Sequence, residues 1–270
     1  MKRTLLKSNN SIEIPVVDDE EWGLTQYIRE TNCASPKSRM IDILMVVKDQ
    51  FPYVKHCIES IRKNTPRYHL HVWDNGSEEI TAGYLRMLAE QASWPQQMTL
   101  YRKEENTGFI IPNNRLIEMG DLEYVVLLNS DCYMREGWDR ALTGWLEHSP
   151  HTAQVGYMGG YLDHSGRGVR GGQGDSVDYI CGCCFCIRRS TYEEIGLFDE
   201  DHLEFAYCED ADLSMRLREA GKKIYALHLP LVEHYGNKTA IPVIKENHQI
   251  SGIIAKNHTY LQQRWKKFLP

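Results

Sequence analysis

The tripeptide Asn129-Ser130-Asp131 directly follows the apolar run Tyr124–Leu128. A carboxylate at the end of such a run can bind Mg²⁺ or Mn²⁺, while waters and phosphate oxygens complete an octahedral coordination shell. Asp131 could equally cap the segment that follows it, so the tripeptide alone leaves both roles open.

A second acidic group, Glu209-Asp210-Ala211-Asp212, precedes the apolar positions Leu213 and Leu217 of a predicted helix. Capping of the helix explains one of these carboxylates but not three within four positions. Crowded like charges are costly unless a cation or a proton transfer uses them. A carboxylate at a helix N-terminus is stabilised as the anion, so it can accept a proton.

One histidine is a candidate metal ligand. His234 stands in Glu233-His234-Tyr235-Gly236, after the predicted strand Ile224–Leu227. Neutral imidazole binds divalent metals readily, although a single histidine is more often structural. A ligand role for His234 therefore depends on the acids around it.

Four of the eight cysteines lie within the run Cys181–Cys186. Alternating strand residues face opposite ways, so we expect Cys181 and Cys183 on one face and Cys184 and Cys186 on the other. A zinc site needs four convergent ligands, usually as two separated pairs, and the sequence has no second CxxC pair. The run is typical of a buried strand, and its free thiols suit a reducing compartment.

Strands and helices are predicted to alternate along the first half of the chain. Ile41–Val47 is a short, branched, apolar strand, and the spacing of Val54, Cys57, Ile58 and Ile61 predicts an amphipathic helix after it. Further strands are predicted at 68–73, 98–102 and 124–128, with helices at about 78–91 and 111–119. This alternation indicates an α/β fold with a mostly parallel sheet and helices on both faces.

In such sheets ligands bind beyond the carboxyl ends of the strands. Two polar clusters follow strands in this way, Asp74-Asn75-Gly76-Ser77 and Asn129-Ser130-Asp131. Their placement alone suggests a nucleotide or phosphate site.

Charge and hydropathy exclude several other classes of protein. Among 270 residues, 31 are Lys or Arg and 37 are Asp or Glu, so the formal net charge of −6 gives no overall attraction to nucleic acid or anionic lipid. No apolar run approaches the ~18 residues of a membrane span, and the first thirty residues lack the apolar stretch of a signal peptide. We expect a cytoplasmic protein, or one peripheral to the inner face of a membrane, with residues 1–37 as an arm.

Six segments stand in order along the chain: Val72–Ser77, Glu105–Phe109 with Asn113-Asn114, Leu127–Asp131, Arg188–Glu200, Glu209–Leu213 and Asn257–Trp265. Together they resemble family 2 glycosyltransferases, specifically the bacterial rhamnosyltransferase-like branch, from about Ile41 to about Trp265. Two departures stand out: Asn129 replaces the first acid of the D-x-D-type metal motif, and Val47-Lys48-Asp49-Gln50 lacks the usual Thr/Ser-Tyr-Asn.

The resemblance implies a GT-A fold, with a catalytic domain at 38–236 and a C-terminal helical segment at 237–270. It implies a nucleotide-sugar donor, such as a UDP-, TDP- or GDP-sugar, and inversion at the anomeric carbon. The acceptor would carry a free hydroxyl on a glycan, a lipid-linked sugar, a protein or a modified nucleic acid.

The resemblance also assigns roles to residues. Asp131 and His234 would bind the divalent cation, Mn²⁺ or Mg²⁺, and Asp210 would be the general base. Spacing alone does not separate Asp210 from Glu209, but the resemblance favours Asp210, with Glu209 and Asp212 positioning the acceptor or the helix. Asp74 would contact the nucleobase, and the other donor-site residues would be Val47, Asn75, Asn106, Gly108, Asn113, Asn129 and Ser130.

The segment 164–176 holds five glycines and reads as a mobile loop. It carries Arg167 and Arg170, and we expect it to close over the donor or acceptor and exclude water. An ordinary surface loop is the alternative.

Two other functions stay open. A sugar-phosphate nucleotidyltransferase would need a glycine-rich basic loop after the first strand, and Lys48–Pro52 is not such a loop. A non-catalytic nucleotide-sugar-binding protein would not need the acids Glu209, Asp210 and Asp131.

Overall fold

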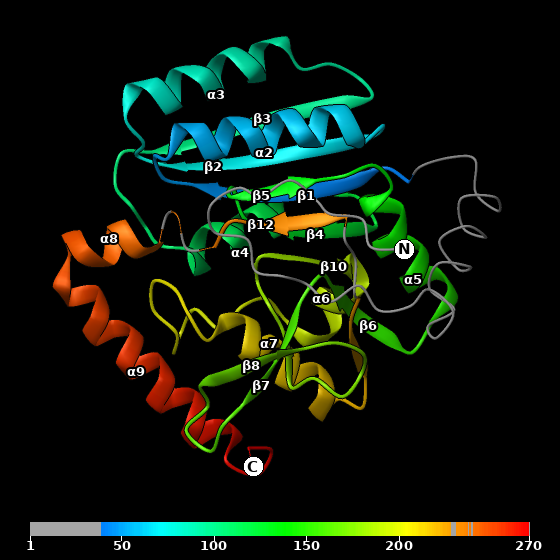
Figure 1. Ribbon diagram of the computed structural model, residues 1–270, viewed down its shortest axis with the longest axis vertical. Coiled ribbons are helices and arrows are strands. Elements are labelled where there is room, and N and C mark those ends of the chain that lie inside the picture. The colour runs from blue at the N-terminus through cyan, green and yellow to red at the C-terminus, as the bar shows by residue number, and fades with distance from the viewer. Residues whose placement is uncertain (1–38, 228–230, 237, 239, 270) are drawn as a thin grey trace, which may run out of the picture. The chain divides into compact units, whose positions relative to one another are not determined.

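A seven-stranded sheet forms the centre of the computed structural model, which describes residues 39–227, 231–236, 238 and 240–269 (Figure 1). The strand order is β11-β6-β10-β4-β1-β2-β3, and all strands run parallel except β10, which is antiparallel to β4 and β6. The strands are β1 Ile41–Val47, β2 Tyr68–Asn75, β3 Gln96–Lys103, β4 Tyr124–Leu128, β6 Thr152–Gly156, β10 Cys184–Arg188 and β11 Lys223–Ala226. The arm expected at 1–37 lies outside the described residues.

The middle strands are buried on both faces. Every residue of β4 is buried, and β1 is buried throughout except for the partly exposed Val46. Strands of this kind must be covered by helices on both sides. The helices are α2 Phe51–Asn64, α3 Glu79–Gln91, α4 Ile110–Met119, α5 Trp138–His148, α6 Arg189–Ile195, α7 Glu209–Glu219, α8 Ala240–Glu246 and α9 His248–Trp265. The predicted α/β class with a mostly parallel sheet is confirmed.

Two smaller sheets flank the central one. The first pairs β5 with β12, and the second places β7 between β8 and β9. None of the helices in the described ranges is long and apolar enough to cross a membrane. The smaller strands are β5 Cys132–Met134, β7 Gly159–Leu162, β8 Gly168–Gly172, β9 Tyr179–Ile180 and β12 Val232–His234.

The structure corrects the expectation of an irregular glycine-rich loop at 164–176. Five of its residues form β8, which pairs antiparallel with β7. Glycine is depleted in strands, so composition predicted a loop. Here aromatic rings lie close against the strand, because a Cβ added to Gly172 would lie 2.3 Å from the ring of Tyr161. Arg170 stacks on the same ring: its guanidinium carbon lies 3.7 Å from the centroid of the Tyr161 ring.

The cysteine run is also only partly a strand. β10 begins at Cys184, and Cys181 and Cys183 belong to the turn before it. The strand is therefore shorter than the predicted cysteine run, while Cys184 and Cys186 lie two residues apart on β10 and share a face, as predicted. Burial raises the pKa of the Cys184 and Cys186 thiols, which pack as small apolar groups in the sheet.

Candidate active site

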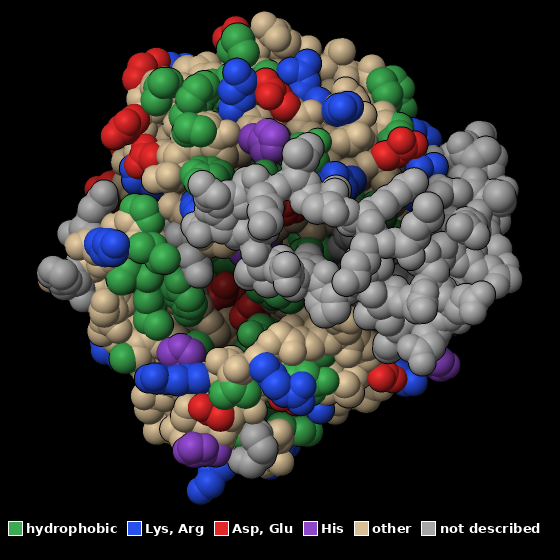
Figure 2. Space-filling view, viewed as in Figure 1, with side chains coloured by type: hydrophobic (Ala, Val, Ile, Leu, Met, Phe, Trp, Pro, Cys, Tyr) green, Lys and Arg blue, Asp and Glu red, His purple; other side chains and the backbone are tan. Residues whose placement is uncertain are grey.

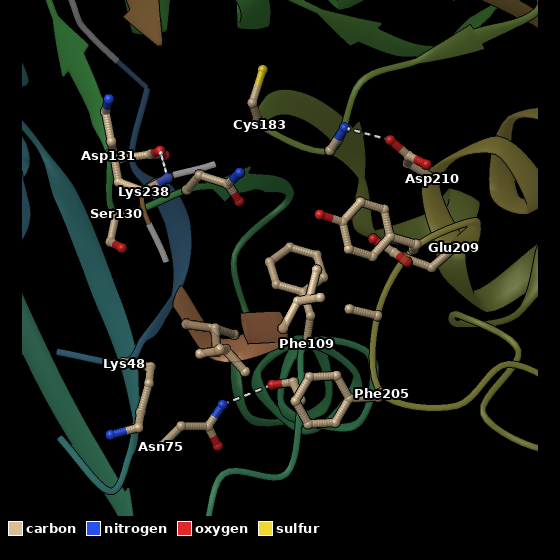
Figure 3. Close-up of a pocket in the computed structure, with 18 of the residues that line it drawn as sticks. Lys48, Asn75, Phe109, Ser130, Asp131, Cys183, Phe205, Glu209, Asp210 and Lys238 are labelled. Atoms are coloured by element: carbon tan, nitrogen blue, oxygen red, sulfur yellow. Dashed lines mark hydrogen bonds between the residues drawn. The ribbon is translucent and has the colours of Figure 1, made fainter. Parts of the chain in front are cut away.

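A cavity of about 240 Å³ opens at the carboxyl ends of β1, β2 and β4 (Figure 3). Its opposite wall is the loop before α7 and the first turn of that helix. Figure 2 shows acidic side chains at the bottom of a hollow on one face of the molecule. The lining residues include Val46, Lys48, Asn75, Asn106, Gly108, Phe109, Asn129, Ser130, Asp131, Cys181, Gly182, Phe205, Tyr207, Glu209, Asp210, His234, Lys238, Val243, Ile244 and Ile250.

Pairing of β12 with β5 brings His234 to Asp131, although the two lie far apart in the sequence. His234 stands opposite Cys132 in this pairing, and its Nε2 lies 3.1 Å from Oδ1 of Asp131. The other carboxylate oxygen accepts a hydrogen bond from the backbone N–H of Lys238 at 3.2 Å (Figure 3). Burial opposes the charge on each side chain, but their mutual attraction is stronger, so the pKa of Asp131 is lowered and that of His234 is raised.

The donor atoms at this corner fit a divalent cation. Nε2 of His234 is buried and makes no hydrogen bond of normal geometry, even to the nearby carboxylate. One ligand atom from each of Asp131, Cys132 and His234 lies within 4.8 Å of the others. Burial raises the pKa of the Cys132 thiol, which donates to the carbonyl of Cys183, so Cys132 does not join the set as a thiolate. The carboxylate and imidazole that remain suit Mn²⁺ or Mg²⁺.

The carboxylates of Glu209 and Asp210 face the cavity from the first turn of α7 (Figure 3). Asp210 accepts two backbone hydrogen bonds, from Gly182 N–H at 2.9 Å and from Ala211 N–H at 2.8 Å. Glu209 has a buried Oε2 with no hydrogen-bond partner. Burial and the charge of Asp210 raise the pKa of Glu209 to about 8. Burial also raises the pKa of Asp210, but its backbone N–H donors oppose this, whereas Oε2 of Glu209 has no donor, so the pair holds negative charge on Asp210 in preference to Glu209.

Five of the eight predicted donor-site residues line the cavity, and the other three are buried away from it. Val47 is buried on the other face of β1, and its neighbour Val46 lines the cavity instead. Asp74 is fully buried, where it pairs with Arg102 and accepts the N–H of Ser77. Asn113 is also fully buried. The lining members are Asn75, Asn106, Gly108, Asn129 and Ser130.

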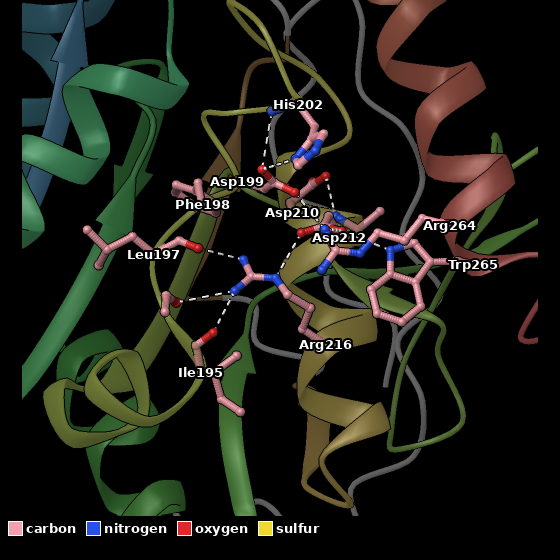
Figure 4. Close-up of polar contacts among 12 residues, drawn as sticks. Ile195, Leu197, Phe198, Asp199, His202, Asp210, Asp212, Arg216, Arg264 and Trp265 are labelled. Atoms are coloured by element: carbon pink, nitrogen blue, oxygen red, sulfur yellow. Dashed lines mark hydrogen bonds and ion pairs between the residues drawn. The ribbon is translucent and has the colours of Figure 1, made fainter.

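Asp212 lies apart from the cavity and joins α7 to α9 (Figure 4). This buried carboxylate accepts Nε1–H of Trp265 at 2.9 Å and pairs with Arg216 at 2.8 Å. Asp199 makes a second connection to α9, because it accepts from Arg264 at 2.6 Å and from the hydroxyl of Tyr260.

The two arginines of the glycine-rich segment, Arg167 and Arg170, are absent from the described lining of the cavity. Arg170 lies on β8 against Tyr161. Sequence reasoning missed several residues that do line it, namely Phe109, Cys181, Gly182, Phe205, Tyr207, Lys238, Val243, Ile244 and Ile250.

Comparisons with known proteins found relatives of this chain by sequence and by fold. Over 64 residues the chain is 36% identical to an N-acetylglucosaminyl-diphospho-decaprenol L-rhamnosyltransferase of Mycobacterium tuberculosis. The aligned part is 23% of this chain and 20% of that relative, so the match spans a fifth of the relative's length.

Solved structures share the fold. GalNAc-T7 with UDP, GalNAc and Mn²⁺ aligns with a TM-score of 0.61 and 17% identity, over 73% of this chain and 43% of that one. Mannosyltransferase PcManGT from Pyrobaculum calidifontis, in complex with GDP-Man and Mn²⁺, aligns with a TM-score of 0.60 and 14% identity, over 91% of this chain and 78% of that one. These likenesses are to proteins of the GT-A fold. Residues 42–196, more than half of the chain, match the profile of glycosyl transferase family 2, and the chain belongs to that family.

Proposed function

We propose that the protein is an inverting, divalent-metal-dependent glycosyltransferase that moves a sugar from a nucleoside diphosphate to an acceptor hydroxyl, with Asp210 as the general base. The observation that carries the proposal is one cavity that holds both the Asp131–His234 pair and a carboxylate fixed by two backbone N–H groups.

The donor would lie along the carboxyl ends of β1, β2 and β4. Lys48 and Asn75 line the cavity there, and Nδ2 of Asn75 donates a 2.7 Å hydrogen bond to the carbonyl of Gly108. Two structural neighbours were solved with UDP and with GDP-Man, each with Mn²⁺, which supports a nucleotide-sugar donor.

Asp131 and His234 would hold the cation. When bound there, the cation supplies positive charge that stabilises the departing diphosphate. Asp131 is already ionised, because its pKa is lowered, and the buried Nε2 of His234 has no other partner. On binding an ion, the two side chains would exchange their contact with each other for contacts with the ion, and His234 would bind as the neutral imidazole.

Asp210 would take the proton of the acceptor hydroxyl as that oxygen forms a bond to the anomeric carbon and the bond to the diphosphate breaks. The pKa of a hydroxyl is far above neutral, so proton removal must accompany attack, and a positioned base contributes ~10²–10⁴-fold. Glu209 is the weaker candidate for the base, because its raised pKa keeps it protonated at neutral pH.

The acceptor side of the cavity is largely apolar. Phe205, Tyr207, Val243, Ile244 and Ile250 line it. The rhamnosyltransferase relative is named for a lipid-linked sugar acceptor, and the apolar lining is compatible with a hydroxyl on such a molecule.

The test begins with UDP-, GDP- and TDP-sugars and Mn²⁺ against a panel of hydroxylated acceptors, with the anomeric configuration of the product read by NMR. Asp210→Asn should leave donor binding nearly unchanged and lower kcat by at least ~100-fold. Glu209→Gln is the matched control and should retain most of the activity. Normal turnover by Asp210→Asn together with an inactive Glu209→Gln would move the base to Glu209. Two active variants, or retention of configuration, would overturn the single-displacement mechanism.

A further inference from the structure

The loop that leads into α7 has an unfavourable backbone. Phe205, Tyr207 and Cys208 have φ angles of 62°, 73° and 75°. Residues with a Cβ rarely adopt this left-handed conformation, and they keep it only where their surroundings enforce it. The strained stretch ends at Cys208, directly before Glu209 and Asp210.

Side chains of a helix that is distant in the sequence hold this loop: Nδ1 of His258 lies 3.4 Å from Sγ of Cys208, and Asn257 makes the larger set of contacts. Asn257 of α9 is 1% exposed. Its Oδ1 accepts the N–H of Glu204 at 3.1 Å, and its Nδ2 lies 2.7, 3.0 and 3.2 Å from the carbonyl oxygens of Glu204, Ala206 and Tyr207. A single amide thus pairs with polar backbone groups of three loop residues inside the protein.

The other side of the loop rests on the donor-side segment. The carbonyl of Phe205 accepts the N–H groups of Phe109 at 2.6 Å and Ile110 at 3.2 Å, at the start of α4. Gly108 lies so close that an added Cβ would be 2.4 Å from that carbonyl oxygen. The loop is therefore fixed between α4 and Asn257.

The position of the loop sets the first turn of α7. The carbonyl of Cys208 accepts the N–H of Asp212 at 2.8 Å, so the strained residue before the helix also begins its hydrogen-bond ladder. Asp210 reaches the N–H of Gly182 only from this turn. A change of backbone conformation at 205–208 would rotate the turn and move the carboxylate.

Asn257 is not needed to anchor α9. Asp199 binds Tyr260 and Arg264, and Asp212 binds Trp265, so the last turns of α9 are fixed by other contacts (Figure 4). The hydrogen bonds of Asn257 all serve the loop.

We propose that Asn257 is a positioning residue, which acts through the 204–208 loop to hold the Asp210 carboxylate where it can take the acceptor proton. This inference rests on the proposed function of Asp210. It assigns to α9 a part in catalysis although no residue of that helix beyond Ile250 appears in the described lining of the cavity.

The test compares Asn257→Ala and Asn257→Asp with the control Leu261→Ala in the full chain. Leu261 is also buried on α9, where it lies against Gly166, and its apolar side chain makes no hydrogen bond to the loop. Asn257→Asp keeps the size of the side chain and the acceptor for the N–H of Glu204, but it loses the N–H donors to the three carbonyls. It therefore tests the positioning role if Asn257→Ala does not fold. The measurements are kcat and donor KM with the best nucleotide sugar and Mn²⁺, and Tm.

We expect each Asn257 variant to lower kcat about 10- to 100-fold, since small displacements of reacting groups have effects of this size, with donor KM within about twofold of wild type. Leu261→Ala should lower Tm without this loss of kcat. Wild-type kcat in the Asn257 variants, or an equal loss in Leu261→Ala, overturns the positioning role. If Asp210→Asn is inactive in that case, the proposed function stands; if Asp210→Asn is fully active, the proposed function itself fails.

Discussion

Replacement of Glu209 by Gln should change the stability of the protein in a pH-dependent way. Glu209 is 7% exposed, its Oε2 has no hydrogen-bond partner, and the charge of Asp210 lies beside it. These conditions disfavour its ionised form in the folded protein but not in the unfolded chain. Glutamine keeps the size of the side chain and removes the ionisation.

The sign and size of this change in stability follow from the linkage between proton binding and folding. The pKa of Glu209 rises from an ordinary 4.5 to about 8 in the folded protein. Below pH 4.5 both states are protonated and Glu209 imposes no penalty; between pH 4.5 and 8 the folded state holds an extra proton and loses stability as the pH rises. Each pKa unit corresponds to about 1.36 kcal/mol, so above pH 8 the penalty approaches ~5 kcal/mol.

Urea unfolding at pH 4.5, 6.5 and 8.5, with EDTA present, measures the effect as the difference between Glu209→Gln and wild type. The variant should gain stability relative to wild type as the pH rises, by a few kcal/mol over this range. In an Asp210→Asn background the gain should shrink, because the charge that raises the pKa is gone. A difference that is constant across pH would refute the assignment of a buried, protonated Glu209.

Three other changes test other parts of the site. Asp131→Ala should abolish the Mn²⁺ dependence of nucleoside diphosphate binding in calorimetry; equal affinity with and without Mn²⁺ in both proteins would remove Asp131 from the metal site. Gly108→Ala should lower the free energy of unfolding by more than ~1–3 kcal/mol, because left-handed strain adds to a clash with Phe205, whereas Gly174→Ala at φ 81°, with open space around it, shows the strain alone. Asp42→Asn should lower it by ~1–3 kcal/mol, because the buried carboxylate that pairs with the partly exposed Arg189 and contacts the buried His71 is lost; unchanged urea midpoints would contradict either expectation.

Much of the fold could be predicted because the pattern of apolar residues in its strands and helices matches the faces that are buried. Ile41–Val47 and Tyr124–Leu128 are apolar at nearly every position, and both are buried central strands. The predicted face of α2 is likewise its buried face. The turn at Cys181–Cys183 and strand β8 were harder to predict from the sequence. Cysteine and glycine occur in both strands and loops, and only contacts with distant residues decide which of the two forms.

The candidate site was predictable where a motif places a side chain at a strand end, and less so where the chain must fold back. Asp131 and Ser130 follow β4 and line the cavity. The prediction of Val47 missed by one residue: its neighbour Val46 lines the cavity, and successive side chains of a strand point to opposite faces. Nothing in the spacing of His234 specifies its register against Cys132, which puts the imidazole beside Asp131.

The geometry of Asp210 depends mainly on backbone groups, and this explains why sequence patterns say so little about it. Its two hydrogen-bond donors are the N–H groups of Gly182 and Ala211, and any residue type but proline supplies such a group. The loop before it is held through carbonyl oxygens, which again carry no side-chain signature. The amide of Asn257 pairs with these backbone groups, and it lies on α9, which is distant from Asp210 in the sequence. A mechanism built on backbone groups is therefore visible only after the chain has folded, while its acidic residues can be recognised before.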